Sequence, residues 1–274
     1  MDLTAVTVES VEEPLCSNAP DEVVAQIAGV AARYPRATAI GVTLGGTVLD
    51  GLVTSAEFLN WTDVPLRDMV GRATGNPTTV DNDVQALTAA EHWFGVGAGL
   101  DSMAVITVGA GLGTGLIVGG RLVAGAHGLP PRFHHVLVHA NGPLCGCGRR
   151  GCASSYLLTH VMLRQLEGPP TYEEALDRVR NGDPEAKRVF GDAGYALGVL
   201  IGTIANAVDP QKVLLTGEGV PLYQVASQLV HDGIEDTYEG DPDLLELDVQ
   251  PFDFSEWARS AGALAIKSTI AGSG

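Results

Sequence analysis

One histidine and three cysteines near the middle of the chain form the strongest candidate for a chemical site. They follow the pattern His135, nine residues, Cys145, one residue, Cys147, four residues and Cys152. Four such ligands in so short a stretch predict a closed tetrahedral zinc site of the structural type, since a catalytic zinc keeps one position open. The glycines between the cysteines allow the backbone to turn tightly enough to bring the thiolates together.

The same residues allow other interpretations. The cysteines could be buried free thiols, or two of them could form a disulfide, which a reducing compartment disfavours. His134 and His139 flank His135, and each is an alternative histidine ligand.

A short polar run lies at the end of a predicted strand, residues 78–80, and opens a predicted helix, residues 84–94. The run is Asp81-Asn82-Asp83. Strand ends in open α/β sheets are where ligands bind. Asp83 is therefore a candidate general base toward a substrate hydroxyl, with Asn82 binding a neighbouring hydroxyl. The alternative is that one of these side chains caps the helix.

Two glycine-rich turns are candidates for binding a nucleotide. Residues 108–115 lie between two predicted strands, 103–108 and 115–118, and backbone N–H groups of such a turn can approach a phosphate. Residues 216–219 follow a third predicted strand, 212–215, and could approach an adenosine. Both segments are also compatible with ordinary structural turns. The candidate nucleotide-binding residues are Gly109, Gly111, Gly113, Thr114, Gly217 and Gly219.

The elements around these residues alternate between strands and helices, which predicts an α/β fold. Further strands are expected at 3–9, 37–43, 121–124, 136–138 and 245–249, and further helices at 21–33, 66–74, 154–166, 172–180, 184–208 and 255–270. We predict a smaller N-terminal α/β domain, residues 1–100, completed by the helix 255–270. A larger α/β domain, residues 101–254, carries the metal loop 130–152.

The composition of the chain indicates which partners it can bind and in which compartment it is expected. The formal net charge of −17 predicts that this chain does not itself bind DNA. The first residues lack the basic and apolar regions of a signal peptide. The longest apolar run, 193–208, is interrupted by glycines and is expected to be a buried helix. These features predict a cytoplasmic protein without a membrane span.

Together the motifs resemble the ROK family of repressors and sugar kinases over nearly the whole chain. The resemblance rests on Asp81-Asn82-Asp83, the glycine turn 109–116, Gly125-Ala126-His127-Gly128 and the His-Cys-Cys-Cys pattern. It implies an actin-like, ribonuclease-H-like two-domain ATPase fold with a zinc-bearing loop, and homodimers or tetramers. It also implies that Asp83 is the base and that His135 both binds zinc and shapes a sugar pocket.

Several positions depart from the family pattern. Arg132 and Ser154 stand where the family has sugar-binding glutamates, and the chain opens at a segment that looks like the end of the family's second strand. The first phosphate-gripping hairpin and the repressors' N-terminal winged helix are therefore expected to be absent. The resemblance thus assigns the sugar contacts to Asn82, Asp83, Arg132, His135 and Ser154.

These departures favour a sugar-sensing protein, the effector-binding part of a transcriptional regulator similar to the repressors of high-GC bacteria, with a degenerate kinase site. Arg132 then suggests an anionic sugar derivative. The alternative is a hexose or amino-sugar kinase that uses ATP and Mg²⁺, with Asp83 as base. A third hypothesis is an interaction protein with a vestigial site.

Overall fold

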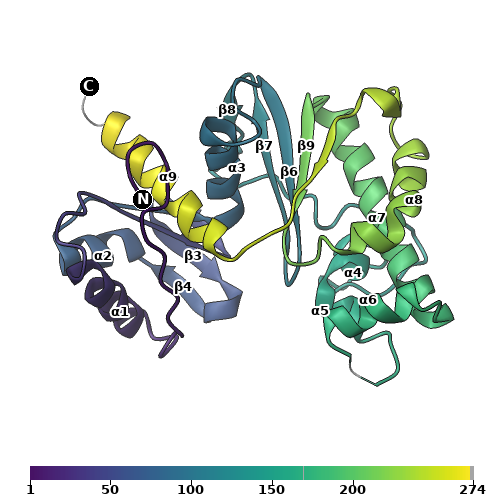
Figure 1. The fold of residues 1–274 in the computed structure, drawn as a ribbon, viewed down its shortest axis with the longest axis horizontal. Helices are drawn as coiled ribbons and strands as arrows, with labels where there is room; N and C mark the ends of the chain where they lie inside the picture. The colour runs from purple at the N-terminus through teal and green to yellow at the C-terminus, as the bar shows by residue number, and fades with distance from the viewer. Residues whose placement is uncertain (169, 272–274) are drawn as a thin grey trace. The chain divides into compact units, whose positions relative to one another are not determined.

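The computed structural model describes residues 1–168 and 170–271 and divides into two units (Figure 1). The first unit consists of Met1–Gly99, Ala124–Pro130 and the described part of Phe254–Gly274. The second consists of Leu100–Val123 and Pro131–Asp253. Each unit has its own buried hydrophobic cluster.

The first unit contains two small sheets. Strands β1 (Ile40–Leu44) and β5 (Thr78–Asn82) pair in parallel, while β2 (Thr47–Leu49), β3 (Leu52–Ala56) and β4 (Trp61–Val64) form an antiparallel sheet. A 3₁₀ turn, Glu57–Leu59, joins β3 to β4. The helices of this unit are α1 (Pro20–Ala32), α2 (Leu66–Thr74), α3 (Asp83–Phe94) and α9 (Ser255–Ala271).

Helix α9 ties the C-terminal part of the chain to β1 and α3. The Thr43 hydroxyl donates to the Trp257 carbonyl at 3.1 Å. A β-carbon added at Gly41 would overlap with the Ala261 carbonyl, so only glycine lets α9 approach β1 this closely. On α9, Arg259 binds Glu256 at 2.6 Å and also the largely buried carboxylate of Glu91 on α3.

The second unit is built on a five-stranded sheet in the order β10-β9-β6-β7-β8. Its strands are β6 (Ser102–Val108), β7 (Leu112–Val118), β8 (Arg121–Leu122), β9 (Lys212–Thr216) and β10 (Leu247–Val249). Strands β6 and β9 are parallel neighbours, with Thr107 opposite Thr216, so their carboxyl ends meet at one edge. Most side chains of β6 are fully buried, as expected for a central strand.

Helices α4 (Ser154–Leu157), α5 (Thr159–Leu163), α6 (Tyr172–Arg180), α7 (Pro184–Val208) and α8 (Leu222–Glu235) complete the second unit, with a 3₁₀ turn at Pro242–Leu244. Helix α7 is long and apolar enough to cross a membrane, but 78% of its apolar window is buried inside the protein. It packs along α8, where a β-carbon on Gly198 would overlap with the Val230 carbonyl. The apolar run 193–208 is therefore a core helix, as predicted.

Three sequence-based predictions differ from the structure, and one small sheet was not predicted at all. Residues 3–9 form no strand, because the Asp2 carboxylate accepts hydrogen bonds from Thr4 and Val6 and closes a local turn. The strands β2, β3 and β4 were not predicted. The helix 154–166 is broken at Leu158, where the Thr159 N–H donates to the Gly109 carbonyl instead of extending the helix. The predicted strand 136–138 is reduced to one bridge, Leu137 to Cys152.

Candidate functional site

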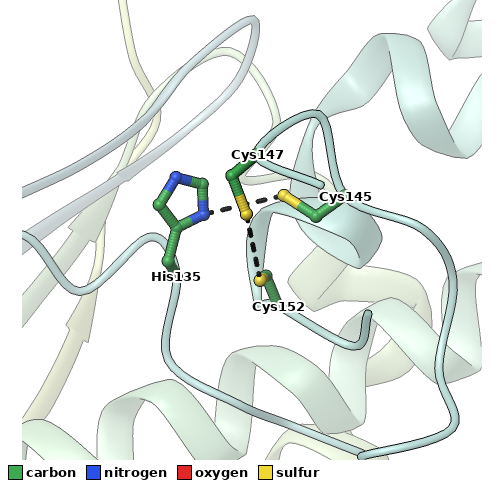
Figure 2. Close-up of side chains that lie close together, drawn as sticks. All are labelled: His135, Cys145, Cys147 and Cys152. Atoms are coloured by element: carbon green, nitrogen blue, oxygen red, sulfur yellow. Dashed lines mark hydrogen bonds between the residues drawn. The ribbon is translucent and has the colours of Figure 1, made fainter. Parts of the chain in front are cut away.

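The structure brings together all four residues of the predicted metal site. One ligand atom from each of His135, Cys145, Cys147 and Cys152 lies within 4.8 Å of the others (Figure 2). The Sγ atoms of Cys147 and Cys152 are 3.7 Å apart, and Cys145 Sγ is 3.6 Å from His135 Nδ1. Bond lengths of a tetrahedral zinc centre imply separations of about 3.8 Å between two sulfurs and about 3.6 Å between sulfur and nitrogen. The donor set therefore fits a four-coordinate metal ion.

The Sγ–Sγ distance excludes a disulfide, and the histidine whose ring nitrogen lies within the cluster is His135. All four cysteines are free, and 3.7 Å is far longer than the ~2.05 Å of a sulfur–sulfur bond. His139 is exposed and its Nδ1 accepts from the Asn141 N–H, while the His134 ring packs against that of His135. His135 is thus the histidine of the cluster.

Backbone hydrogen bonds between residues 134–138 and 151–154 bring His135 close to the cysteines of the cluster. The Val138 N–H donates to the Gly151 carbonyl, and the Ala153 N–H donates to the Val136 carbonyl. Gly151 has a φ of +70°, and a β-carbon there would overlap with the His139 carbonyl. Only glycine therefore allows the last cysteine of the motif to turn back toward His135.

The Ser154 hydroxyl is buried beside the cluster. Its Oγ lies 3.3 Å from Cys145 Sγ and 3.4 Å from His135 Nδ1. A hydroxyl in this place would hold His135 and Cys145 in position for a metal ion bound by the cluster. The family resemblance assigned Ser154 only to sugar binding, and that sugar contact stays a prediction. The spacing of Ser154 from Cys152 offered no signal for its contact with Cys145 and His135.

The electrostatics of the cluster favour metal binding at His135 and Cys145 and oppose it at Cys152. Burial and the nearby Arg149 lower the pKa of His135, so the imidazole is neutral at neutral pH. Burial acts to raise the pKa of Cys145, but hydrogen bonds from the Cys147 backbone and the Ser154 hydroxyl outweigh it and the pKa is lowered. Burial and the neighbouring thiols raise the pKa of Cys152 to about 11.

The polar run of the first unit lies where β5 ends and α3 begins. The Asn82 side chain caps α3, because its Oδ1 accepts from the Val84 and Gln85 N–H groups at 3.0 and 3.1 Å. Its Nδ2 donates to the Gly46 carbonyl. The capping alternative is therefore correct for Asn82, and its role toward a hydroxyl stays a prediction.

The two carboxylates beside Asn82 differ in their surroundings. Burial raises the pKa of Asp81, although the Asn82 N–H partly opposes this shift. Asp83 is partly buried at the first position of α3, and its Oδ1 accepts from the Val84 N–H. A β-carbon added at Gly45 would lie 3.5 Å from Asp83 Oδ2 and 3.6 Å from the ring of Phe58, which is 73% exposed.

The two glycine-rich segments meet at the carboxyl ends of β6 and β9. The Gly219 N–H donates to the Val108 carbonyl at 2.7 Å, and Gly217, with a φ of +107°, packs directly against Val108. Only residues 109–111 form the turn. Gly113 and Thr114 lie within β7, and the Thr114 hydroxyl donates to the Pro131 carbonyl. Their assignment to nucleotide binding stays a prediction.

Glu218 contacts the first glycine turn, a contact that the sequence did not predict. Its Oε1 accepts from the Ala110 N–H at 2.7 Å, and a β-carbon on Gly109 would overlap with its carboxylate. The signal available in the sequence was a carboxylate between two glycines at a strand end. Pairing it with residue 110 required knowing that β6 and β9 are neighbours.

The chain is similar in sequence to sugar kinases and to a xylose repressor. The chain is 33% identical to the glucokinase of Thermotoga maritima over 191 residues, which cover 66% of this chain and 60% of that protein. It is 26% identical to the xylose repressor of Bacillus subtilis over 180 residues, which cover 64% of this chain and 47% of the repressor. The chain thus spans about half to three fifths of the length of these relatives.

A solved structure of a ROK family transcriptional regulator, a homologue of the E. coli MLC protein, superimposes with a TM-score of 0.85 at 23% identity. The match covers 98% of this chain and 74% of the regulator. The α/β fold is therefore the actin-like fold of the sugar kinases and their regulator relatives, as the sequence predicted. The family model for ROK proteins matches residues 3–266, and with this fold and the Cys₃His loop the chain belongs to the ROK family.

Proposed function

We propose that this chain is the sugar-sensing part of a ROK-type regulator and that its ligand is an anionic sugar derivative. The observation that carries the proposal is Arg132, an exposed cation three residues before the candidate metal ligand His135. Arg132 lies close to His134, whose pKa is lowered by burial, by His135 and by Arg132. A guanidinium pairs well with a phosphate or carboxylate, and an arginine in place of an acid reverses the charge preference of a binding loop.

The relatives support a sugar ligand and a regulator as a possible role. They include a glucokinase and a xylose repressor, so sugars are the ligand class that the relatives' names share. The net charge of −17 supports leaving DNA contact to another part of the regulator. Assembly as a homodimer or tetramer stays a prediction from the family resemblance.

Titration of the chain with glucose, glucose 6-phosphate and gluconate by calorimetry tests the ligand class. The anionic ligands are expected to bind at least about tenfold more tightly than glucose, which corresponds to about 1.4 kcal/mol. Arg132→Gln should abolish this preference, whereas the matched control Arg121→Gln, an exposed arginine on β8, should retain it. Equal or tighter binding of neutral glucose by the unaltered chain would overturn the proposal.

A second candidate function is an ATP-dependent sugar kinase. The position of Asp83 at the carboxyl end of a parallel strand favours it, because a general base there can take the proton of a sugar hydroxyl. Coupled ADP-release assays with a panel of hexoses and amino sugars decide between the two. Turnover that Asp83→Asn abolishes would establish the kinase.

Zinc is the proposed metal. A Cys₃His set with tetrahedral spacing favours zinc over the harder cations, which prefer oxygen ligands. With all four positions supplied by protein side chains, the metal would hold the loop together and would leave no position for a reacting water. The expected content is one zinc per chain.

Metal binding is expected to release protons and to strengthen as pH rises. Because the pKa of Cys152 in the metal-free protein is about 11, its thiol is protonated at pH 7 and must lose that proton to bind zinc. The apparent Kd for zinc should therefore fall about tenfold for each pH unit per proton released between pH 6 and 8. Calorimetry in buffers of different ionisation enthalpy measures the proton count, and a Kd independent of pH would contradict the prediction.

A further inference from the structure

The glycine turn of the second unit already holds an anion that belongs to the chain itself. The Ala110 N–H donates to Glu218 Oε1 at 2.7 Å. In a nucleotide-binding turn, a backbone N–H of this kind donates to a phosphate oxygen. The carboxylate lies directly against Gly109, in the space that the absence of a side chain at this position leaves open. The Gly109 N–H is also used, because it donates to the Gly111 carbonyl.

The backbone around Glu218 is held on two sides, so the carboxylate is directed at the turn. The Gly219 N–H donates to the Val108 carbonyl at 2.7 Å, and the Tyr172 hydroxyl donates to the Gly219 carbonyl at 2.7 Å. Burial raises the pKa of Tyr172, so its hydroxyl remains a neutral donor at physiological pH. These contacts all lie within the second unit and connect the ends of β6 and β9.

We propose that Glu218 occupies the anion-binding position of the glycine turn and thereby excludes the phosphates of a nucleotide. A phosphate at this turn would have to displace the carboxylate from the Ala110 N–H and would then lie beside its negative charge. Like charges placed together in this way select strongly against a ligand. Glu218 is thus a specificity-determining residue. The inference goes beyond the proposed function, since it names what keeps nucleotides out of this unit whatever sugar the chain binds.

The test compares nucleotide binding by the full chain and by the variants Glu218→Gln and Glu218→Gly. Binding of ATP with Mg²⁺ and of inorganic triphosphate is measured by calorimetry. Both variants are expected to bind at least about tenfold more tightly than the unaltered chain, because the charge, or the whole side chain, has been removed from the turn. The matched control Glu235→Gln removes the same charge from an exposed residue at the far end of α8 and should change nothing.

Unchanged or weaker nucleotide binding in both variants would overturn the proposal. Weaker binding in Glu218→Gln would mean that the carboxylate assists nucleotide binding, for example through Mg²⁺. A second measurement needs no variant: the amide resonance of Ala110 in the unaltered chain should not shift when inorganic triphosphate is added, and a saturable shift there would refute the exclusion. The sugar titrations are separate, so failure of the sensing proposal leaves this result interpretable.

Discussion

Cys152→Ser is expected to abolish stoichiometric zinc binding and to lower the thermal midpoint by roughly 10 °C. Residues 134–153 form no helix or strand, and their ligand atoms converge through two isolated bridges and a set of backbone hydrogen bonds. Without a metal, Cys145 and Cys152 remain buried thiols whose packing alone must hold the loop. Loss of a structural metal is among the few changes that cost about 4 kcal/mol or more, and each kcal/mol is worth about 2–4 °C in a chain of this size.

Cys16→Ser is the matched control. Cys16 is the one cysteine outside the cluster, and it is exposed. Metal content by mass spectrometry and the midpoint by calorimetry should be unchanged in this variant. Chelation of zinc from the unaltered chain should reproduce the Cys152→Ser midpoint. A metal-free protein with an unaltered midpoint would show that the loop does not depend on the ion, and the family's metal role would not apply to this chain.

Arg259→Met is expected to lower the free energy of unfolding by about 3–5 kcal/mol. Arg259 joins α9 to α3 by binding Glu91, whose side chain is only 8% exposed, and it also binds Glu256 on α9 itself. Removing the guanidinium leaves Glu91 as a buried charge without its cation, which costs more than the ion pair itself contributes. Because α3 begins at Asp83, loosening this helix should also weaken any ligand binding that depends on Asp83.

Two further variants separate the buried pair from ordinary surface pairs. Arg188→Met breaks the exposed pair between Arg188 and Asp192 on α7, where both side chains are more than half exposed, and should cost at most about 0.5 kcal/mol. The double variant Arg259→Met with Glu91→Gln should recover part of the loss, since no uncompensated charge remains. Chemical denaturation measures all of these, and a loss in Arg259→Met no larger than in Arg188→Met would contradict the prediction.

Long, periodic elements were predictable because their signals are local. Helices α2, α6 and α7 begin and end where the sequence predicts, with a capping box at Thr171 and Glu174 for α6 and an Asp183 cap followed by proline for α7. The metal cluster was predictable for a related reason. Three of its four ligands lie within eight residues, so the chain between them has little freedom and the glycines limit it further.

The short strands β2, β3 and β4 have three to five residues each and carry little periodicity, so only their pairing with one another makes them strands. The reverse holds for residues 3–9, whose alternating pattern predicts a strand that the Asp2 turn replaces. Likewise, the helix expected at 154–166 is interrupted because Thr159 bonds to Gly109, a residue fifty positions earlier in the chain.

The sequence alone therefore determined the fold class, the family resemblance, the four residues of the candidate metal cluster and the main helices, because these depend on residue types and on spacings of a few positions. Only the tertiary structure decided that Asn82 caps α3, that Ser154 contacts His135 and Cys145 and that Glu218 fills the glycine turn. Each of these contacts depends on where a side chain finds its hydrogen-bond partner. For Glu218 that partner lies in the turn after β6, a strand that neighbours β9 only in the folded sheet, and sheet order is a property of the folded chain that no local pattern encodes.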